Sequence, residues 1–269
     1  MSDDAVRCDA VSCRAAQLEV EVANLPAEAR LFESERMLVA HARAPQIPAL
    51  LREIGRLREL AFRAVGEGTG SDLDLDRFDS RYGHLFVWDR EQHALAGAYR
   101  VASTEDFADH ELPQALYTHT LFDYGPALLA RLGPALELGR AFVTPEYQRC
   151  SRVLALLWKG IHCALERTGV RTLFGAVSVS SSYTRRSRGL IAAALLRHHR
   201  HVESEGLVRA RTPFALELGG EFAAWHVDRA FGDSLDGLMV LSLDRADPVR
   251  VARYSRSRSI APRTSSAVS

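Results

Sequence analysis

The strongest hydrophobic pattern of the chain lies between residues 47 and 65. Apolar residues recur there every three or four positions, which places them on one face of a helix. They are Ile47, Leu51, Ile54, Leu57, Ala61 and Val65. Three glycines follow within five positions, at 66, 68 and 70, and glycine disfavours continued helix. The segment therefore predicts a strong amphipathic helix.

Shorter patterns predict strands and two further helices. Apolar or alternating runs indicate strands at 38–42, 84–88, 94–102, 136–143, 171–179 and 238–243. Helical spacing indicates helices at 153–167, opened by Ser151 as a cap, and at 187–199. Residues 103–134 are rich in loops. A helix, antiparallel strands, a β-α-β-α succession and a last strand together predict one mixed α/β domain.

Composition limits the class of protein. The 269 residues are 47% hydrophobic with a formal net charge of zero, so a core can form and no global field attracts nucleic acid. The longest apolar runs are too short to span a bilayer, so membrane contact would be peripheral, at the inner membrane face. The cysteines and histidines lack metal-ligand spacing and no signal peptide is evident, so reduced thiols, no metal and a cytoplasmic location are expected.

Three polar residues do not fit a simple surface pattern. Arg58 flanks the apolar stripe of its helix, so it must either extend its charge to solvent or meet a carboxylate. Asp76 and Asp79 bracket Phe78, which is expected to be buried, and they are candidate partners. Asp72 and Asp74 of the same acidic stretch fit a solvated loop. Taken alone, an arginine that reaches solvent is the simpler interpretation of Arg58.

The strand at 136–143 carries two charges. Glu137 and Arg140 are three residues apart, so a regular strand would direct them to opposite faces. Gly139 lies between them and permits a bulge, which would bring both side chains to one side. Arg100 ends the strand at 94–102. An outward Glu137 on an ordinary core strand is the alternative.

These residues together resemble a known family. The pattern consists of Leu57-Arg58-x-x-x-Phe62, Asp76-x-Phe78-Asp79, Arg100 and Glu137-Leu-Gly-Arg140. It resembles the ornithine-lipid-type, haemolysin-like N-acyltransferases of the GNAT superfamily, and the related acyl-homoserine-lactone synthases. The segments at 55–59, 62–70, 156–161 and 173–178 are similar to an N-acyltransferase domain that often follows a phospholipid-acyltransferase domain in bacterial proteins. The resemblance covers roughly residues 35–250. It implies a GNAT-like, mostly antiparallel sheet flanked by helices.

The resemblance also implies roles for particular residues. Glu137 would be the base that deprotonates the amine, with backbone amides around Gly139 to Ala141 stabilising the oxyanion. The other members of the catalytic group would be Arg58, Asp76, Asp79, Arg100 and Arg140, which organise the carboxylates or bind an amino-acid carboxylate. The acyl donor would meet Phe142, Val143, Gln148, Arg149, Ser151 and Arg152. The substrate pocket would include Phe62, Phe78, Ser178 and Ser180. Buried ion pairing that only fixes the fold is the alternative for the charged group.

One departure from the family bears on the donor. GNAT enzymes that use coenzyme A carry glycines in the loop that holds the pyrophosphate at a helix N-terminus. In this chain Ser151 and Val153 replace both glycines, and bulkier residues hinder close approach of a pyrophosphate. This favours the phosphopantetheine of acyl carrier protein over coenzyme A. The missing tryptophan between Phe62 and Asp79 counts against a signal synthase.

The sequence therefore predicts transfer of a fatty acyl group, with 3-hydroxyacyl groups included, from acyl carrier protein to the amine of a small amino acid in amino-acid-lipid biosynthesis. Acyl-CoA as donor, a homoserine-lactone-type synthase, and a silent module that binds carrier protein or a partner phospholipid acyltransferase are the alternatives. No tightly bound cofactor is expected. The expected organisation is a partly helical extension at 1–34, the acyltransferase domain at 35–250 and a disordered Arg/Ser-rich tail at 251–269. Asp228, Phe231, Asp236 and Gly237 are interpreted as structural.

Overall fold

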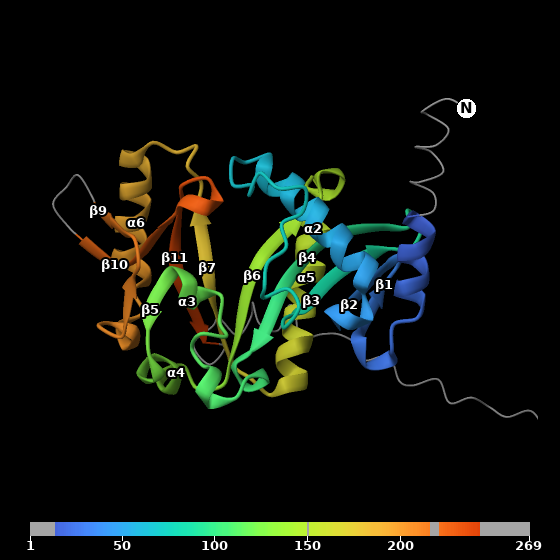
Figure 1. Ribbon diagram of the computed structural model, residues 1–269, viewed down its shortest axis with the longest axis horizontal. Helices are drawn as coiled ribbons and strands as arrows, with labels where there is room; N and C mark the ends of the chain where they lie inside the picture. Colours follow the sequence, from blue (N-terminus) through green and yellow to red (C-terminus); the bar gives the residue numbers. More distant parts are fainter. Residues whose placement is uncertain (1–13, 150, 216–220, 243–269) are drawn as a thin grey trace, which may run out of the picture.

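A nine-stranded sheet organises the part of the chain that the computed structural model describes, residues 14–149, 151–215 and 221–242 (Figure 1). In sheet order its strands are β1 (Arg30–Ser34), β2 (Met37–Arg43), β3 (Gly83–Asp89), β4 (Ala94–Ser103), β6 (Ala135–Val143), β7 (Thr172–Val179), β11 (Ser234–Ser242), β10 (Glu221–Asp228) and β9 (Pro213–Ala215). Only the β6–β7 pair among them is parallel. The predicted mixed, mostly antiparallel sheet flanked by helices is confirmed.

The helices lie on both faces of this sheet. They are α2 (Pro48–Arg63), α3 (Thr118–Leu121), α4 (Pro126–Leu132), α5 (Ser151–Thr168) and α6 (Arg185–His199). The pleat of β2 and β3 separates two cores, because alternate side chains of a strand face opposite sides. Val39 and Leu85 pack with α5, whereas Leu38 and Phe86 pack with α2. The helices predicted at 47–65, 153–167 and 187–199 therefore form and cover the sheet.

The segment before the sheet is closely tied to α2. Residues 14–23 are helical, and the side chains of Leu18 and Val22 are buried in the core beneath α2. The Glu21 carboxylate accepts hydrogen bonds from the backbone N–H groups of Ala49 and Leu50, both at 2.8 Å. Two amides of the first helical turn, which have no partner within the helix, are thereby satisfied. The sheet begins at β1, a few residues before the domain boundary predicted at residue 34.

Two parts of the chain differ from the pattern of the sequence. The strand predicted at 38–42 is the second of the sheet, because β1 precedes it and pairs with it through Phe32 and Val39. The loop-rich region at 103–134 holds α3, α4 and the short strand β5 (Phe122–Tyr124), which pairs with β8 (Val208–Ala210). The tail predicted at 251–269 lies outside the described residues, which end at residue 242. Within the described ranges, no helix combines the length and apolar character needed to cross a membrane.

The sheet opens between its two parallel strands. β6 and β7 pair only from Ala135–Thr172 to Glu137–Phe174, and beyond this point Figure 1 shows them diverging. Gly175 lies at the point of divergence, where an added Cβ would stand 2.1 Å from the carbonyl oxygen of Leu138. Only glycine therefore permits so close an approach of the two backbones. Past that contact, the backbone of β6 has no β7 partner among the described residues.

A bulge bends β6 just after the opening. Arg100 of β4 faces Gly139 and Ala98 faces Phe142, so two residues of β6 stand opposite Tyr99 alone. This is the pattern of a β-bulge. The bulge predicted from Gly139 is present, but the positive φ of 50° falls on Arg140 and not on the glycine. A non-glycine residue with positive φ is uncommon and marks a constrained site.

Candidate active site

Arg58 is the centre of a buried ionic cluster. Its position on the inner face of α2 leaves the residue only 1% exposed. Its Nη1 and Nη2 donate to the two carboxylate oxygens of Asp79, each at 3.0 Å, and its Nε lies 3.0 Å from Asp74 Oδ2. Of the two interpretations of Arg58, the carboxylate partner is the one observed, and the simpler interpretation, an arginine that reaches solvent, is wrong. The interpretation of Asp74 as a solvated residue is wrong, because Asp74 is 2% exposed and belongs to the cluster.

Arg100 extends the cluster from the sheet side. Its Nη1 lies 2.7 Å from Asp76 Oδ1 and 3.2 Å from Asp79 Oδ2. The guanidinium also lies over the rings of Tyr82 and Tyr117, at 5.3 and 4.9 Å from their centroids. A desolvated guanidinium gains from such aromatic contacts in addition to its ion pairs. Side chains from α2, β4 and the acidic loop therefore meet in one place.

The charges of the cluster control the ionisation of its members. Burial alone would raise the pKa of Asp79, but the charges of Arg58 and Arg100 outweigh it and hold the pKa at about 2. Burial would likewise lower the pKa of Arg100, but Asp79 and Asp76 raise it. Each buried charge therefore stays ionised through its neighbours.

Arg140 connects this cluster to the opening of the sheet. The bulge directs its side chain toward the acidic loop, where Nε lies 3.5 Å from Asp74 Oδ2 and Nη2 lies 3.8 Å from Asp76 Oδ2. Its guanidinium lies over the rings of Tyr117 and Phe231, at 5.0 and 4.7 Å from their centroids. These ion pairs are longer than those of Arg58, so Arg140 is held more loosely.

Glu137 makes contacts that the sequence did not predict. Its carboxylate accepts a short hydrogen bond from the Tyr82 hydroxyl, and bonds from the backbone N–H groups of Tyr117 at 3.0 Å and Thr118 at 2.7 Å. Glu137 is 2% exposed, and burial together with Glu137 itself raises the pKa of Tyr82, which stays a neutral donor. Both carboxylate oxygens are thus engaged by donors from other segments. The role of base stays a prediction, and the contacts favour an anchor for the start of α3.

The four residues predicted for the substrate pocket make separate contacts. Phe78 lies beneath Arg100 with its ring 5.8 Å from Tyr82, so it belongs to the base of the cluster. Phe62, at the end of α2, meets Phe231 edge to face at 4.9 Å. Ser178 of β7 donates to Asp236 Oδ1 of β11 at 2.7 Å, and Ser180 donates to the carbonyl of residue 65 at 3.2 Å.

The residues predicted to meet the donor lie around the start of α5. Phe142 is buried in the core beneath α2, and the Gln148 amide donates to the Val143 carbonyl at 3.1 Å. Gln148 and Arg149 are exposed beside the first turn, which begins at Ser151. Arg152 reaches Glu35 at 2.6 Å, so its charge is offset. Their assignment to the donor stays a prediction.

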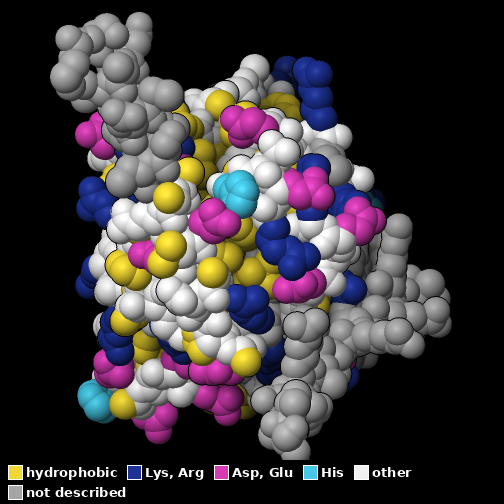
Figure 2. Space-filling view, turned by 90° about the vertical axis from the view of Figure 1, so that its right-hand side faces the viewer, with side chains coloured by type: hydrophobic (Ala, Val, Ile, Leu, Met, Phe, Trp, Pro, Cys, Tyr) yellow, Lys and Arg dark blue, Asp and Glu magenta, His cyan; other side chains and the backbone are white. Residues whose placement is uncertain are grey.

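Charges are also offset along the edge of the sheet that carries β1. Arg90 pairs with Glu33 at 2.8 Å and Arg36 pairs with Glu91 at 3.2 Å. The face seen in Figure 2 accordingly mixes basic and acidic side chains and does not separate them by sign. Exposed pairs of this kind contribute little to stability.

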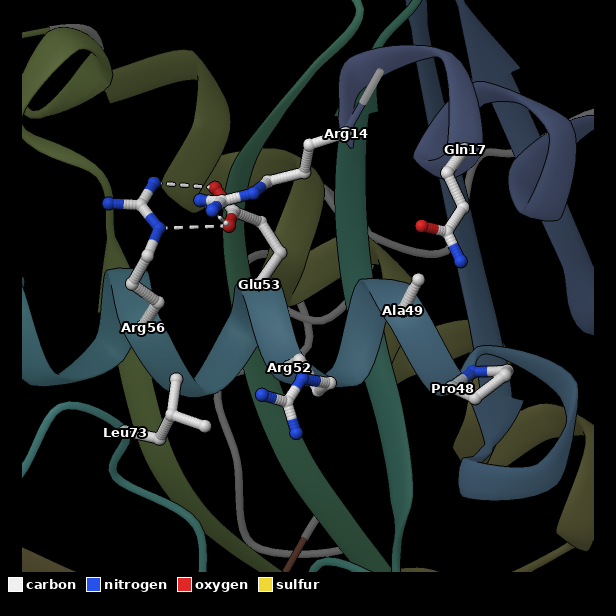
Figure 3. Close-up of a pocket in the computed structure, with 8 residues that line it drawn as sticks. All are labelled: Arg14, Gln17, Pro48, Ala49, Arg52, Glu53, Arg56 and Leu73. Carbon is white, nitrogen blue, oxygen red and sulfur yellow. Dashed lines mark hydrogen bonds and ion pairs between the residues drawn. The ribbon is translucent and has the colours of Figure 1, made fainter. Parts of the chain in front are cut away.

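A pocket of about 440 Å³ lies on the outer side of α2, away from the cluster (Figure 3). Arg14, Arg52 and Arg56 line it, and Figure 3 shows Arg56 held to Glu53. Both Arg56 bonds, at 2.9 and 2.6 Å, go to this carboxylate, which Arg14 also approaches at 3.8 Å. Since none of its lining residues touches Glu137, Arg140 or the opening of the sheet, we do not assign the chemistry to this pocket.

Sequence reasoning missed several members of the site. Asp74, Tyr82 and Tyr117 join the cluster through contacts between distant segments, and no local pattern marks them. Asp236 was interpreted as structural. It is 3% exposed, and a charged residue in an otherwise apolar last strand is the one signal that could have identified it.

Comparison with known proteins defines the class. Residues 57–159 match the family model described as an acetyltransferase (GNAT) domain. This range runs from the helix that carries Arg58 through β4 and β6 to α5, so this part of the chain is similar to a GNAT acetyltransferase domain. The GNAT fold expected from the resemblance is confirmed.

Particular relatives are more specific in name. A glycine N(alpha)-acyltransferase of Bacteroides thetaiotaomicron is 36% identical over 196 residues, which cover 68% of this chain and 57% of that protein. A protein of the same name from Phocaeicola vulgatus is 34% identical over 183 residues, covering 63% and 55%. The chain thus spans little more than half the length of these relatives.

A solved structure shows a weaker likeness. The CoA-dependent acyl-homoserine lactone synthase BjaI is 13% identical, with a TM-score of 0.44 over 78% of this chain and 84% of that one. At this level the likeness carries no functional argument.

Proposed function

We propose that this protein is an N-acyltransferase that moves an acyl group from a thioester donor to the amine of a small amino acid, with glycine as the first candidate. The observation that carries the proposal is the opening of the sheet at β6–β7 beside the cluster of Arg58, Arg100 and Arg140. Backbone amides of β6 without a β7 partner supply donors for an oxyanion. The sequence relationship to proteins named glycine N(alpha)-acyltransferase favours the same acceptor.

Arg140 is proposed to bind the carboxylate of the acceptor. It lies on the bulge at the opening and is 12% exposed in its side chain, whereas Arg58 and Arg100 are each 1% exposed. Its ion pairs to Asp74 and Asp76 are the longest of the cluster, so an incoming carboxylate would compete with them. Guanidinium groups hold carboxylates in a fixed two-point geometry. Arg58, Asp79 and Arg100 are proposed to hold the cluster that keeps Arg140 in place.

The donor is proposed to be acyl carrier protein, with fatty acyl groups, 3-hydroxyacyl groups included, as cargo. Ser151 opens α5 where the coenzyme A loop carries a glycine, and Val153 is fully buried and cannot yield space. Phosphopantetheine on a carrier protein has one phosphodiester and needs less room than a pyrophosphate. The product would be an N-acyl amino acid, and a partner phospholipid acyltransferase would act on it in amino-acid-lipid biosynthesis.

The test is a transfer assay with the purified chain. Palmitoyl-carrier protein or palmitoyl-CoA is supplied with glycine or a panel of amino acids, and the N-acyl product is measured by mass spectrometry. N-acylglycine formed faster from carrier protein supports both parts of the proposal, and faster transfer from coenzyme A would reverse the assignment of the donor. No product from any donor and amino acid would refute the enzymatic proposal.

A paired variant tests the role of Arg140. Arg140→Ala should lower kcat/KM for glycine, while ethanolamine, which has no carboxylate, should lose much less. Arg131→Ala, an exposed arginine on α4, is the control and should change neither. An equal loss for both amines would show that Arg140 does not bind the carboxylate.

A further inference from the structure

A second group of acids lies beside the opening, on the side of β7 away from β6. Asp236 of β11 stands opposite Ser178 of β7 in the sheet register. Its Oδ1 accepts from the hydroxyls of Ser178 at 2.7 Å and Ser234 at 3.2 Å. Its Oδ2 makes no hydrogen bond to any residue that the structure describes. One carboxylate oxygen is therefore held by two hydrogen bonds, and the other is available to accept one.

The end of α2 brings a second buried acid to the same place. Glu67 follows α2 and is 8% exposed, yet its carboxylate has no hydrogen bond or ion pair among residues 14–149, 151–215 and 221–242. The turn between β10 and β11, with the short helix η7 (Arg229–Phe231), lies against this segment. A Cβ on Gly232 would stand 1.9 Å from the carbonyl oxygen of Gly66. This contact holds the segment that carries Glu67 against the turn between β10 and β11.

The local charge of this group is negative. Asp228, which caps η7 through its bond to Ala230 N at 3.0 Å, is 8% exposed and adds a third acid. Arg140 is the cation that acts on Asp236, but it is also shared with Asp74 and Asp76. Buried carboxylates are normally paired, because an isolated buried charge is costly. Among the described residues these three acids form no ion pair of their own, so their negative charge is only partly offset.

The ionisation of the two acids agrees with this shortage. Burial raises the pKa of Asp236 to about 6, and the charge of Asp228 adds to the rise, while the bonds from Ser178 and Ser234 and the charge of Arg140 oppose it. Burial and then the charge of Asp236 raise the pKa of Glu67. With its pKa at about 6, Asp236 is ionised at neutral pH and can exchange a proton in that range.

From this geometry we propose that Asp236 receives the ammonium group of the acceptor and takes its proton, with Glu67 adding to the attraction. The inference rests on the proposed function, which it deepens by naming the acceptor site. Arg140 on β6 and Asp236 on β11 would bind the two ends of a small zwitterion, with the ring of Phe231 against Arg140 and the ring of Phe62 against Phe231. Within the described residues, no three His, Cys, Asp or Glu side chains are grouped so that they could hold a metal ion.

The reaction balances as follows. One proton moves from the ammonium to Asp236 Oδ2, and the freed nitrogen lone pair forms the C–N bond to the thioester carbonyl carbon. The carbonyl π electrons move to oxygen and return as the C–S bond breaks. The leaving thiolate takes up one proton, and the new amide nitrogen loses its second. Asp236 returns its proton to solvent, so each turnover yields amide, thiol and one net proton.

The test compares Asp236→Asn with Asp233→Asn. Asparagine keeps the shape and the acceptor oxygen for Ser178, so the fold should be retained. Asp233 lies in the turn just before β11 but is exposed, so its variant removes the same charge outside the site. Asp236→Asn should lower kcat/KM for glycine by about 100- to 10,000-fold, the range for loss of a general base. The KM for the donor should stay unchanged, and Asp233→Asn should stay near the wild type.

The pH profile separates a base from a structural role. The wild type should show an ascending limb near pH 6, where Asp236 loses its proton, and Asp236→Asn should lack it. Glu67→Gln should weaken glycine binding but keep the limb, because the charges of Asp228 and Arg140 remain. A loss in Asp236→Asn within threefold of that in Asp233→Asn at every pH would overturn the inference.

A binding measurement distinguishes failure of this inference from failure of the proposed function. Glycine binding is followed by calorimetry in the wild type, Asp236→Asn and Asp233→Asn, without donor. If the wild type transfers no acyl group, the proposed function fails, and calorimetry still decides the site. Glycine binding at least tenfold weaker than in the wild type for Asp236→Asn, but not for Asp233→Asn, supports ammonium recognition. Equal binding in all three proteins, or none in any, would overturn it.

Discussion

Replacing Asp79 by asparagine should cost the protein a large part of its stability. Asp79 accepts two bonds from Arg58 at 3.0 Å and one from Arg100 at 3.2 Å, and its Oδ2 accepts the backbone N–H of Asp76 at 2.7 Å. Asparagine keeps the shape but removes the charge, which leaves two guanidinium groups under-compensated in the interior. Breaking a buried pair in this way typically costs about 3–5 kcal/mol.

The ionisation of Asp79 gives an independent magnitude. Its pKa is held at about 2, against an ordinary value of 3.8. Since a tenfold change in an acid constant corresponds to about 1.4 kcal/mol, the native state gains roughly 2–3 kcal/mol from the charge of Asp79. A lowered pKa means that this stability is present above pH 3.8 and is lost as the pH falls toward 2. We therefore expect a loss of about 3 kcal/mol at pH 7.

Urea unfolding followed by tryptophan fluorescence measures this loss. Asp72→Asn is the matched control, because Asp72 lies in the same acidic stretch but is exposed, and surface changes stay within about 0.5 kcal/mol. The wild type should lose more stability between pH 4 and pH 2 than Asp79→Asn, which has no charge left to titrate there. A loss below about 1 kcal/mol at pH 7 would refute the reasoning, since the buried ion pairs would then add no net stability.

Three further changes test other parts of the site. Gly175→Ala should destabilise the protein by about 1–3 kcal/mol in a thermal melt, because its Cβ would meet the Leu138 carbonyl at 2.1 Å. The control Gly139→Ala has open space around it and should cost under about 1 kcal/mol, and equal melting temperatures of the two variants would contradict the close approach. Glu137→Gln should cost about 1–3 kcal/mol, because the amide cannot accept all three hydrogen bonds, and it should leave the shape of the pH–rate profile unchanged; a lost ascending limb would instead identify Glu137 as the base. Ser151→Gly should lower the KM for acyl-CoA several-fold and leave that for acyl-carrier protein unchanged, and an equal change for both donors would show that Ser151 does not select between them.

The candidate site shows how far sequence reasoning reached. The flanking position of Arg58 on its helix required either solvent or a carboxylate, and this much followed from periodicity. Which carboxylates it meets depends on how the loop after α2 folds back, and Asp74 was misplaced because a run of acids usually lies in solvent. Glu137 was singled out correctly as unusual, but its partners Tyr82 and Tyr117 come from segments 55 and 20 residues away.

The sequence by itself determined the local elements. The spacing of apolar residues specified α2, α5 and most strands, because helix and strand periodicity depend only on near neighbours. Tertiary structure alone decided where β6 and β7 part, which residue takes the positive φ, and that Asp236 and Glu67 share one buried place. These features depend on contacts between residues far apart in the chain. Such contacts arise only when the whole sheet is assembled, so no local pattern of side chains encodes them.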